Sequence, residues 1–157
     1  MYLMISRLLE IKASFNEVLD EMKMDSLLFN EWARLVELEK ILLPFKVQTD
    51  AMQTDTLALS NIIPCILELS LNLQDPSLTK TLAVPLLQAL RRRFSIFLVA
   101  TSAAFDPLPS AACLLDPTVS SAMNRDDTAA LKDAALAYIR QVVSVLQFIQ
   151  LINDEFA

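Results

Sequence analysis

The 157-residue sequence contains no glycine and no histidine. Glycine supplies most backbone positions of positive φ, so its absence favours helices joined by loops of ordinary backbone geometry. The lack of histidine excludes, within this chain, His-based zinc sites, Ser-His-Asp and Cys-His nucleophiles and histidine acid–base pairs. The sequence therefore predicts an all-α protein without a catalytic centre, and we expect no metal and no cofactor.

Cysteine is scarce as well. Cys65 and Cys113 each lie among apolar neighbours and show no CxxC spacing. Because cysteine behaves as a small hydrophobic residue, we expect buried free thiols, with a disulfide or a reactive thiol as the alternative. This usage favours a reducing, intracellular compartment.

Long hydrophobic runs are also missing. The longest charge-free apolar stretches, "FSIFLVATSAAF" and "QVVSVLQFIQLIN", are shorter than the roughly 18–20 residues of a membrane helix. Charged residues interrupt the N-terminal run "MYLMISRLLEIK" early. We expect neither a signal peptide nor a contact with the membrane.

Hydrophobic residues are abundant, at 54%, and the net charge is −6. The usual apolar share of about 45–50% is exceeded even though that figure includes glycine. The excess indicates a surface for self-association or for a protein partner. The acidic balance opposes nonspecific binding of the whole chain to nucleic acid.

Apolar spacing predicts a single domain, residues 1–157, built as an irregular bundle of about five helices with proline kinks. A first helix of about six turns is expected from one apolar stripe: Met4, Leu8, Ile11, Phe15, Val18 and Met22. A second helix, with Asp25 as its N-cap, is expected from another: Leu28, Trp32, Leu35, Leu38, Leu42 and Phe45.

Three prolines, Pro44, Pro64 and Pro85, lie inside apolar runs, where they kink or end a helix. After Pro44 the sequence "QTDAMQTD", residues 48–55, predicts a polar elbow. Asp75-Pro76 predicts a helix start that continues to about Ala100. Within that helix "SIFLVAT" leaves a strand as the alternative.

Residues 103–127 contain three prolines and predict an irregular loop with short helical turns. Asp126 or Asp127 then caps a last helix, and capping explains this pair better than a metal site. The inward side of that helix is expected to carry Leu131, Ala135, Ile139, Val142, Leu146 and Ile149.

Two features are candidate sites. Arg91, Arg92 and Arg93 form the only basic cluster, and successive helical residues point about 100° apart. We expect two of them at the surface and one over the core, as a solvated face or ion pair, with phosphate or partner contact as alternatives. Trp32, the only tryptophan, is expected in the core, with a ligand platform as the alternative.

Four segments in this order resemble the hAT transposase superfamily, including domesticated relatives with BED zinc fingers: "EWARLVELEKILLPFKVQTDAMQTD", "IIPCILELSLNL", "LLQALRRRF" and "LLDP". The positions that match the motifs of that family, within about residues 1–118, are Trp32, Leu42, Pro44, Phe45, Thr49, Ile63, Pro64, Ile66, Arg93, Phe94, Leu115, Asp116 and Pro117.

The resemblance implies the all-helical region that is inserted into an RNase H-like catalytic fold, with the catalytic carboxylates outside it. Thr118 and Val119 replace the aromatic residue and lysine that often follow the Leu-Asp-Pro motif. We therefore expect a non-catalytic scaffold or protein-interaction domain, nuclear by the same resemblance. The alternative is a nucleic-acid-binding or transcription-regulatory module that uses Arg91, Arg92 and Arg93.

Overall fold

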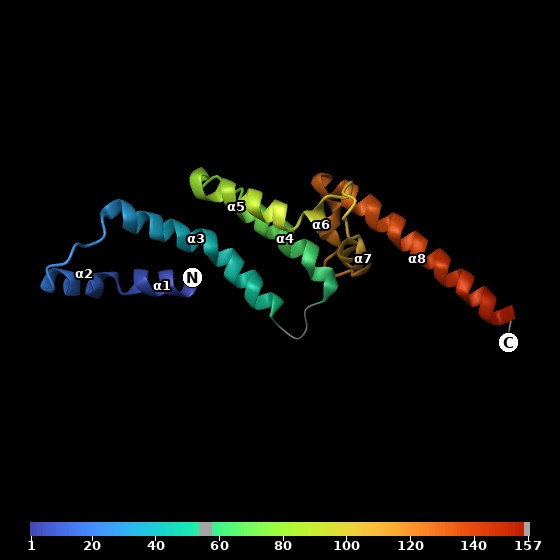
Figure 1. The fold of residues 1–157 in the computed structure, drawn as a ribbon, viewed down its shortest axis with the longest axis horizontal. Helices are drawn as coiled ribbons and strands as arrows, with labels where there is room; N and C mark the ends of the chain where they lie inside the picture. The colour runs from blue at the N-terminus through green and yellow to red at the C-terminus, as the bar shows by residue number, and fades with distance from the viewer. Residues whose placement is uncertain (54–57, 156–157) are drawn as a thin grey trace. The chain divides into compact units, whose positions relative to one another are not determined.

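The computed structural model of the chain describes residues 1–53 and 58–155, with side chains described to residue 150. Over these residues the backbone forms eight α-helices and three short 3₁₀-helices, labelled η1 to η3, and no strand (Figure 1). The predicted all-α class is confirmed. The expected count of about five is too low, because two predicted helices are each divided in two and the segment expected to be irregular contains a helix.

The predicted first helix is two helices, α1 (Tyr2–Glu10) and α2 (Lys12–Glu21). Ile11 separates them with a φ of −92° and a ψ of 11°. α1 lies along α3 (Figure 1) and its buried residue is Ile5, whereas Met4, one position earlier, is 68% exposed. The prediction of one buried stripe through Met4 is therefore wrong, because the break at Ile11 allows α1 to turn a different face inward.

A left-handed residue ends α2. Lys23 has a φ of 55°, and among the described residues it is the only one with positive φ. Its N–H donates to the carbonyl of Asp20 at 3.2 Å, and the N–H of Met24 donates to the carbonyl of Leu19 at 2.9 Å. This is the Schellman pattern, in which glycine usually occupies the left-handed position. In a chain without glycine a lysine takes it, at a cost of roughly 1 kcal/mol.

α3 (Phe29–Met52) begins four residues after the predicted N-cap, Asp25. The N-cap is Leu28, whose backbone is extended. A carboxylate oxygen of Glu31, the third helical residue, accepts the N–H of Leu28 at 2.8 Å. This bond satisfies a backbone donor at the helix start, so the helix begins here and the prediction for Asp25 is wrong.

α3 continues through Pro44 to Met52, so the expectation that the helix ends before Pro44 is wrong. Ile41, one turn earlier, is 1% exposed and anchors this part of the helix. The first half of the predicted polar elbow is helical, since the Thr49 hydroxyl donates to the carbonyl of Phe45 at 2.7 Å. Residues 54 and 55 of that elbow lie outside the described residues, and a kink at Pro44 stays a prediction.

The other two prolines do not end helices either. Pro64 is the third residue of α4 (Ile62–Asn72), which follows η1 (Leu59–Asn61). In a first turn the missing N–H of proline needs no helical partner, so α4 is not interrupted. Pro85 lies inside α5 (Lys80–Arg93).

Asp75 forms a turn instead of the predicted helix start. Its carboxylate accepts the N–H of Ser77 at 2.8 Å, and α5 begins only at Lys80. The Thr79 carbonyl accepts the first helical hydrogen bonds. The predicted helix to about Ala100 is also divided, because α5 is followed by a separate short helix, α6 (Ser95–Leu98). The alternative of a strand over this segment is wrong.

The rest of the chain forms α7 (Leu108–Leu115), η2 (Ser120–Asn124), η3 (Asp126–Thr128) and α8 (Ala129–Glu155). α7 and η2 are the helical turns of the segment expected to be irregular. Asp126 and Asp127 belong to η3, so neither is the N-cap of α8. The residue before α8 is Thr128, which is fully buried and donates its hydroxyl to the carbonyl of Arg125 at 2.8 Å.

The chain divides into two compact units, and α4 and α5 each cross the division. Unit 1 comprises Met1–Asp55 and Leu71–Leu87, and unit 2 comprises Thr56–Ser70 and Gln88–Ala157. The core of unit 2 is a cluster of four buried side chains from α4, α7, η2 and α8: Ile63, Cys113, Met123 and Leu131. Phe97, Leu98 and Phe105 pack around this cluster.

Candidate functional site

The apolar side of α8 is buried at its start and exposed beyond it. Leu131 is 4% exposed and Ala135 is fully buried, as predicted. Val142, Leu146 and Ile149, predicted to face inward, are 38%, 59% and 48% exposed. That part of the prediction is wrong. Every described side chain from residue 140 to residue 150 is exposed.

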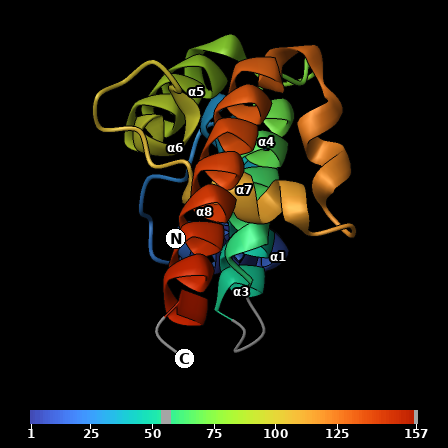
Figure 2. The same cartoon turned by 90° about the vertical axis from the view of Figure 1, so that its right-hand side faces the viewer.

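Only the first part of α8 is covered, because the elements that pack against α8 are short. α8 packs against α7, η2 and η3 (Figure 2). α7 has 8 residues and α8 has 27, so their lengths are about 12 Å and about 40 Å. α8 therefore continues past α7, as Figure 1 shows.

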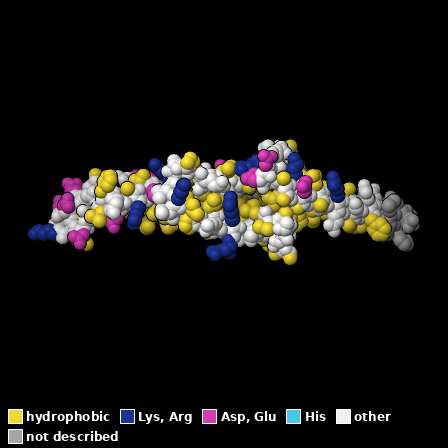
Figure 3. Space-filling view, turned by 90° about the horizontal axis from the view of Figure 1, so that it is seen from above, with side chains coloured by type: hydrophobic (Ala, Val, Ile, Leu, Met, Phe, Trp, Pro, Cys, Tyr) yellow, Lys and Arg dark blue, Asp and Glu magenta, His cyan; other side chains and the backbone are white. Residues whose placement is uncertain are grey.

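We call five exposed apolar residues on this part of α8 the distal face: Val142, Val145, Leu146, Phe148 and Ile149. Val143, which is 45% exposed, points farther round the helix and is not included. No charged residue occurs from Gln141 to Gln150, while the chain as a whole carries a net charge of −6. In Figure 3 hydrophobic side chains are visible in yellow beside the grey atoms at one end of the chain. An uncharged apolar helix surface of this kind is typical of a protein contact.

A groove of about 340 Å³ lies where the covered part of α8 meets the distal face. Tyr138 and Gln141 line it from α8, and Phe105 and Pro107 line it from the segment between α6 and α7. Its lining is mostly apolar and aromatic and carries no charged side chain. The groove can therefore accept an apolar side chain.

Arg91, Arg92 and Arg93 form the last turn of α5, and all three are exposed. The expectation that one of them covers the core is wrong. Among the described residues none of the three guanidinium groups forms an ion pair or a hydrogen bond. The negative end of the helix dipole favours cations here, which explains the cluster without a ligand.

Asp116 ties two parts of unit 2 together. Its carboxylate accepts hydrogen bonds from the Ser60 hydroxyl at 2.7 Å, the Thr118 hydroxyl at 2.6 Å and the Thr118 N–H at 2.9 Å. The side chain of Thr118, then that of Ser60, then the Thr118 amide lower the pKa of the Asp116 carboxyl. This residue joins η1 to the end of α7, and the network is structural.

Sequence reasoning missed Ser60 and Thr118. An Asp followed two residues later by Thr is a common local turn pattern, so Thr118 had a signal. Ser60 is separated from Asp116 by 56 residues and had none.

Trp32 lies in the core of unit 1, as predicted, with 4% of its surface exposed. The ring of Phe15 meets it edge to face at 6.1 Å between centroids, and the Lys12 ammonium lies 4.9 Å from its ring centroid. A stacking ligand would have to displace these contacts.

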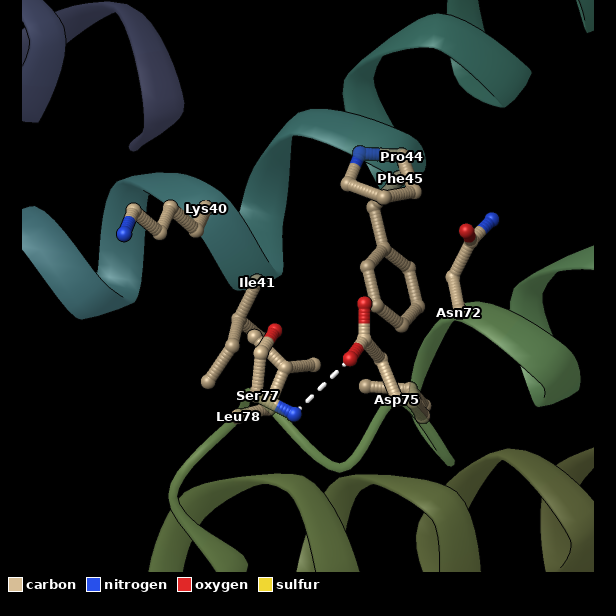
Figure 4. A pocket seen from close by; sticks show the side chains of 9 residues that line it. Lys40, Ile41, Pro44, Phe45, Asn72, Asp75, Ser77 and Leu78 are labelled. Carbon is tan, nitrogen blue, oxygen red and sulfur yellow. Dashed lines mark hydrogen bonds between the residues drawn. The ribbon is translucent and has the colours of Figure 1, made fainter.

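A pocket of about 240 Å³ in unit 1 is lined by Pro44 and Phe45 of α3 and by the turn at Asp75 (Figure 4). Figure 4 shows the carboxylate of Asp75 held by the N–H of Ser77. Hydrogen bonds from Ser77 lower the pKa of the Asp75 carboxyl. Since ligand pockets usually measure about 300–1,000 Å³, this one is small, and its carboxylate is occupied by the turn.

The remaining residues that carry the family resemblance are distributed through the fold. Leu42 is half-buried on α3 in unit 1, whereas Pro64, Phe94 and Pro117 lie in unit 2. They do not belong to one site.

Both cysteines are free and buried, as predicted. Burial raises the pKa of both thiols, and a carboxylate adds to the effect, Glu68 for Cys65 and Asp116 for Cys113. Thiols held protonated in this way are poor nucleophiles. In the described part of the chain no three His, Cys, Asp or Glu side chains are grouped so that they could hold a metal ion.

Comparison with family models, with curated proteins and with solved structures gives no match to this chain. Within the described residues, no helix has the length and apolar character needed to span a membrane.

Proposed function

We propose that this chain is a non-catalytic helical scaffold that binds another protein surface through the distal face of α8. The observation that carries the proposal is a run of exposed apolar side chains, 38–65% exposed, in an uncharged helical segment. An apolar stripe of helical period normally packs against another element. Here the same stripe is buried at Leu131 and exposed at Leu146, so a partner would complete its burial.

The side-chain inventory supports a binding role over catalysis. The chain has no histidine, and burial raises the pKa of its two thiols. The lowered pKa of Asp116 comes from hydrogen bonds that hold the fold together. Each of these groups has a structural explanation.

The proposal extends to a parent protein, the larger protein of which this chain would be one region. It is supported by the resemblance to hAT transposase motifs at Trp32, Pro44, Phe45, Asp116 and neighbouring positions. That parent is a domesticated hAT-transposase-like protein of the BED zinc-finger type, located in the nucleus. The resemblance alone supports this extension. Localisation of the parent protein fused to a fluorescent tag would test it, and exclusion from the nucleus would contradict it.

The interaction role is tested with a dye that fluoresces on apolar surfaces, added to dilute monomeric chain. The double variant Leu146→Gln, Ile149→Gln removes apolar surface without changing charge and is expected to lower the fluorescence clearly. The matched control is Val18→Gln, Leu28→Gln, which changes residues that are 50% and 64% exposed in unit 1. Equal losses in the two variants would contradict a binding surface on α8.

A second candidate function is nucleic-acid binding in transcription, supported by the exposure of Arg91, Arg92 and Arg93 and by their lack of ion pairs. Binding of duplex DNA at low salt is the measurement. Changing all three to Gln is expected to abolish binding and to flatten its salt dependence.

The control for that experiment removes the same charge elsewhere, through Arg34→Gln, Lys80→Gln and Arg140→Gln, all at exposed positions. Equal binding by the cluster variant and the control variant would show that the cluster is not a site.

A further inference from the structure

The groove on unit 2 and the most exposed residue of the distal face lie on the same flank of α8. Gln141 lines the groove, and Phe148, which is 65% exposed, follows it by seven residues. Seven residues correspond to nearly two full turns, so the two positions differ by only about 20° around the helix axis. Ala134, another lining residue, is seven residues before Gln141 on the same flank.

The distal face has the spacing of a helix-pairing seam. Tyr138, Val142, Val145 and Ile149 follow one another at spacings of four, three and four residues. These are the a and d positions of a heptad, and Phe148 lies next to that seam. The seam therefore favours a second helix as its occupant.

Two identical helices can pair in parallel or antiparallel. A twofold axis perpendicular to both helices makes the pair antiparallel, and it brings the same flank of each helix together. A parallel pair brings opposite flanks together instead. Only the antiparallel pair lets Phe148 of each copy meet the groove flank of the other.

We propose that the occupant of the distal face is a second copy of this chain, paired antiparallel through α8, with Phe148 of each copy seated in the groove of the other. The register places Val142 opposite Val145 of the second copy. Phe148 then lies level with Ile139 of the second copy, between the groove residues Tyr138 and Gln141. The inference rests on the proposed interaction role of the distal face and specifies its partner.

The distal face itself carries no charge, so it offers nothing to a charged partner and can accept a second uncharged copy of itself. Each chain carries a net charge of −6, so two copies repel each other in most orientations. The segment from Gln141 to Gln150 has no charged residue, and self-pairing there places no like charges opposite each other.

The available area predicts a weak dimer. The exposed fractions of the five distal-face residues together equal between two and three fully exposed side chains. At roughly 150–200 Å² each, this gives about 800–1,050 Å² for two chains, which is below the roughly 1,200–2,000 Å² of stable interfaces and within the range of weak ones. Micromolar dissociation is therefore expected.

The test is sedimentation equilibrium of the full chain over a wide concentration range. A monomer–dimer equilibrium is expected for the native sequence, and Val145→Lys is expected to abolish it. Phe148→Ala is expected to weaken the dimer about 10–100-fold, as at an interface hot spot. The matched control is Phe29→Ala, because Phe29 is 87% exposed in unit 1 and should leave the dimer constant unchanged.

Orientation is tested by oxidative cross-linking. A mixture of a Val142→Cys chain with a Val145→Cys chain is expected to cross-link much faster than either chain alone, while the native chain, with buried thiols, serves as the control. Faster cross-linking of each single variant with itself would overturn the antiparallel register. An unchanged dimer dissociation constant in Phe148→Ala would overturn the proposal that Phe148 of each copy is seated in the groove of the other.

A chain that stays monomeric at every concentration would overturn the second copy as partner. The interaction role would still stand if the dye signal of the monomer depends on Leu146 and Ile149. Loss of that dye dependence contradicts the interaction role itself, so the two failures are distinguishable. Far-UV circular dichroism confirms that each variant retains its helices.

Discussion

Leu131 and Leu146 lie on the same helix and on the same apolar stripe, yet one is 4% exposed and the other 59%. The two residues have the same side chain, and their directions from the helix axis differ by about 60°. They differ in what is packed against them, since α7, η2 and η3 cover the first part of α8. Periodicity therefore identifies the apolar side of a helix, while only the neighbouring elements decide whether that side is buried.

The largest effect is expected from truncating each leucine. Leu131→Ala removes a side chain from the cluster with Ile63, Cys113 and Met123 and should lower the free energy of unfolding by about 3 kcal/mol. Leu146→Ala should change the free energy of the dilute monomer by less than about 0.5 kcal/mol. Urea unfolding measures both. Similar losses for the two variants would show that the distal face is buried in solution.

Amide hydrogen exchange should divide the helix in the same way. At dilutions that keep the chain monomeric, amides at residues 132–139 are expected to exchange at least roughly 100-fold more slowly than those at residues 142–149. Only the first segment contains a buried side chain, Ala135, so its opening requires the core to separate. Uniform protection along α8 in the monomer would contradict this account. Protection of the second segment that appears with rising concentration would support the dimer.

A variant of Asp116 tests whether the stability of the elements that cover α8 depends on pH. Its pKa is lowered in the folded chain, so its hydrogen bonds contribute stability above the pKa of the unfolded carboxyl. That contribution is lost as the pH falls through the unfolded and then the folded pKa. Asp116→Asn should therefore lower stability at neutral pH, by less than Leu131→Ala does, and should reduce the loss of stability in acid.

The control for this prediction is Asp133→Asn, since Asp133 is exposed on α8. Urea unfolding at several pH values compares the two variants. If both lose stability equally with acid, the network of Ser60, Asp116 and Thr118 does not account for the pH dependence.

The smallest effect is expected from a change that alters no burial. Lys23→Gly relieves the positive φ at the end of α2 and should raise the stability of unit 1 by roughly 0.5–1 kcal/mol. Glu17→Gly, at an exposed position inside α2, is the control and should lower it. Thermal unfolding followed by Trp32 fluorescence is the measurement. A destabilised Lys23→Gly variant would mean that the lysine side chain contributes more than the backbone strain costs.

Sequence reasoning succeeded where the determinants are local. The absence of glycine and the apolar spacing predict an all-helical chain, and the neighbours of Cys65 and Cys113 predict their burial. It failed where the determinants are distant or depend on a single backbone position. No sequence pattern predicts the break between α1 and α2 at Ile11. None predicts the hydrogen bond between Ser60 and Asp116, which are 56 residues apart.

The candidate site shows the same limit. Periodicity predicts the apolar stripe through Val142, Leu146 and Ile149. It does not predict that the stripe is exposed, because the sequence of α8 carries no information on the length of the helix that covers it. The groove beside Tyr138 is formed with Phe105 and Pro107, and side chains from separate segments meet there only in the folded chain.

The positions of the tryptophan and of the cysteines give this protein two built-in spectroscopic reporters. Trp32, the single tryptophan, is buried in unit 1, whereas Cys65 and Cys113 are buried in unit 2. During unfolding of the native sequence, fluorescence follows the first unit and thiol labelling follows the second. Coincident signals define one cooperative folding unit, and signals that separate along the denaturant axis define two, without a single substitution in the sequence.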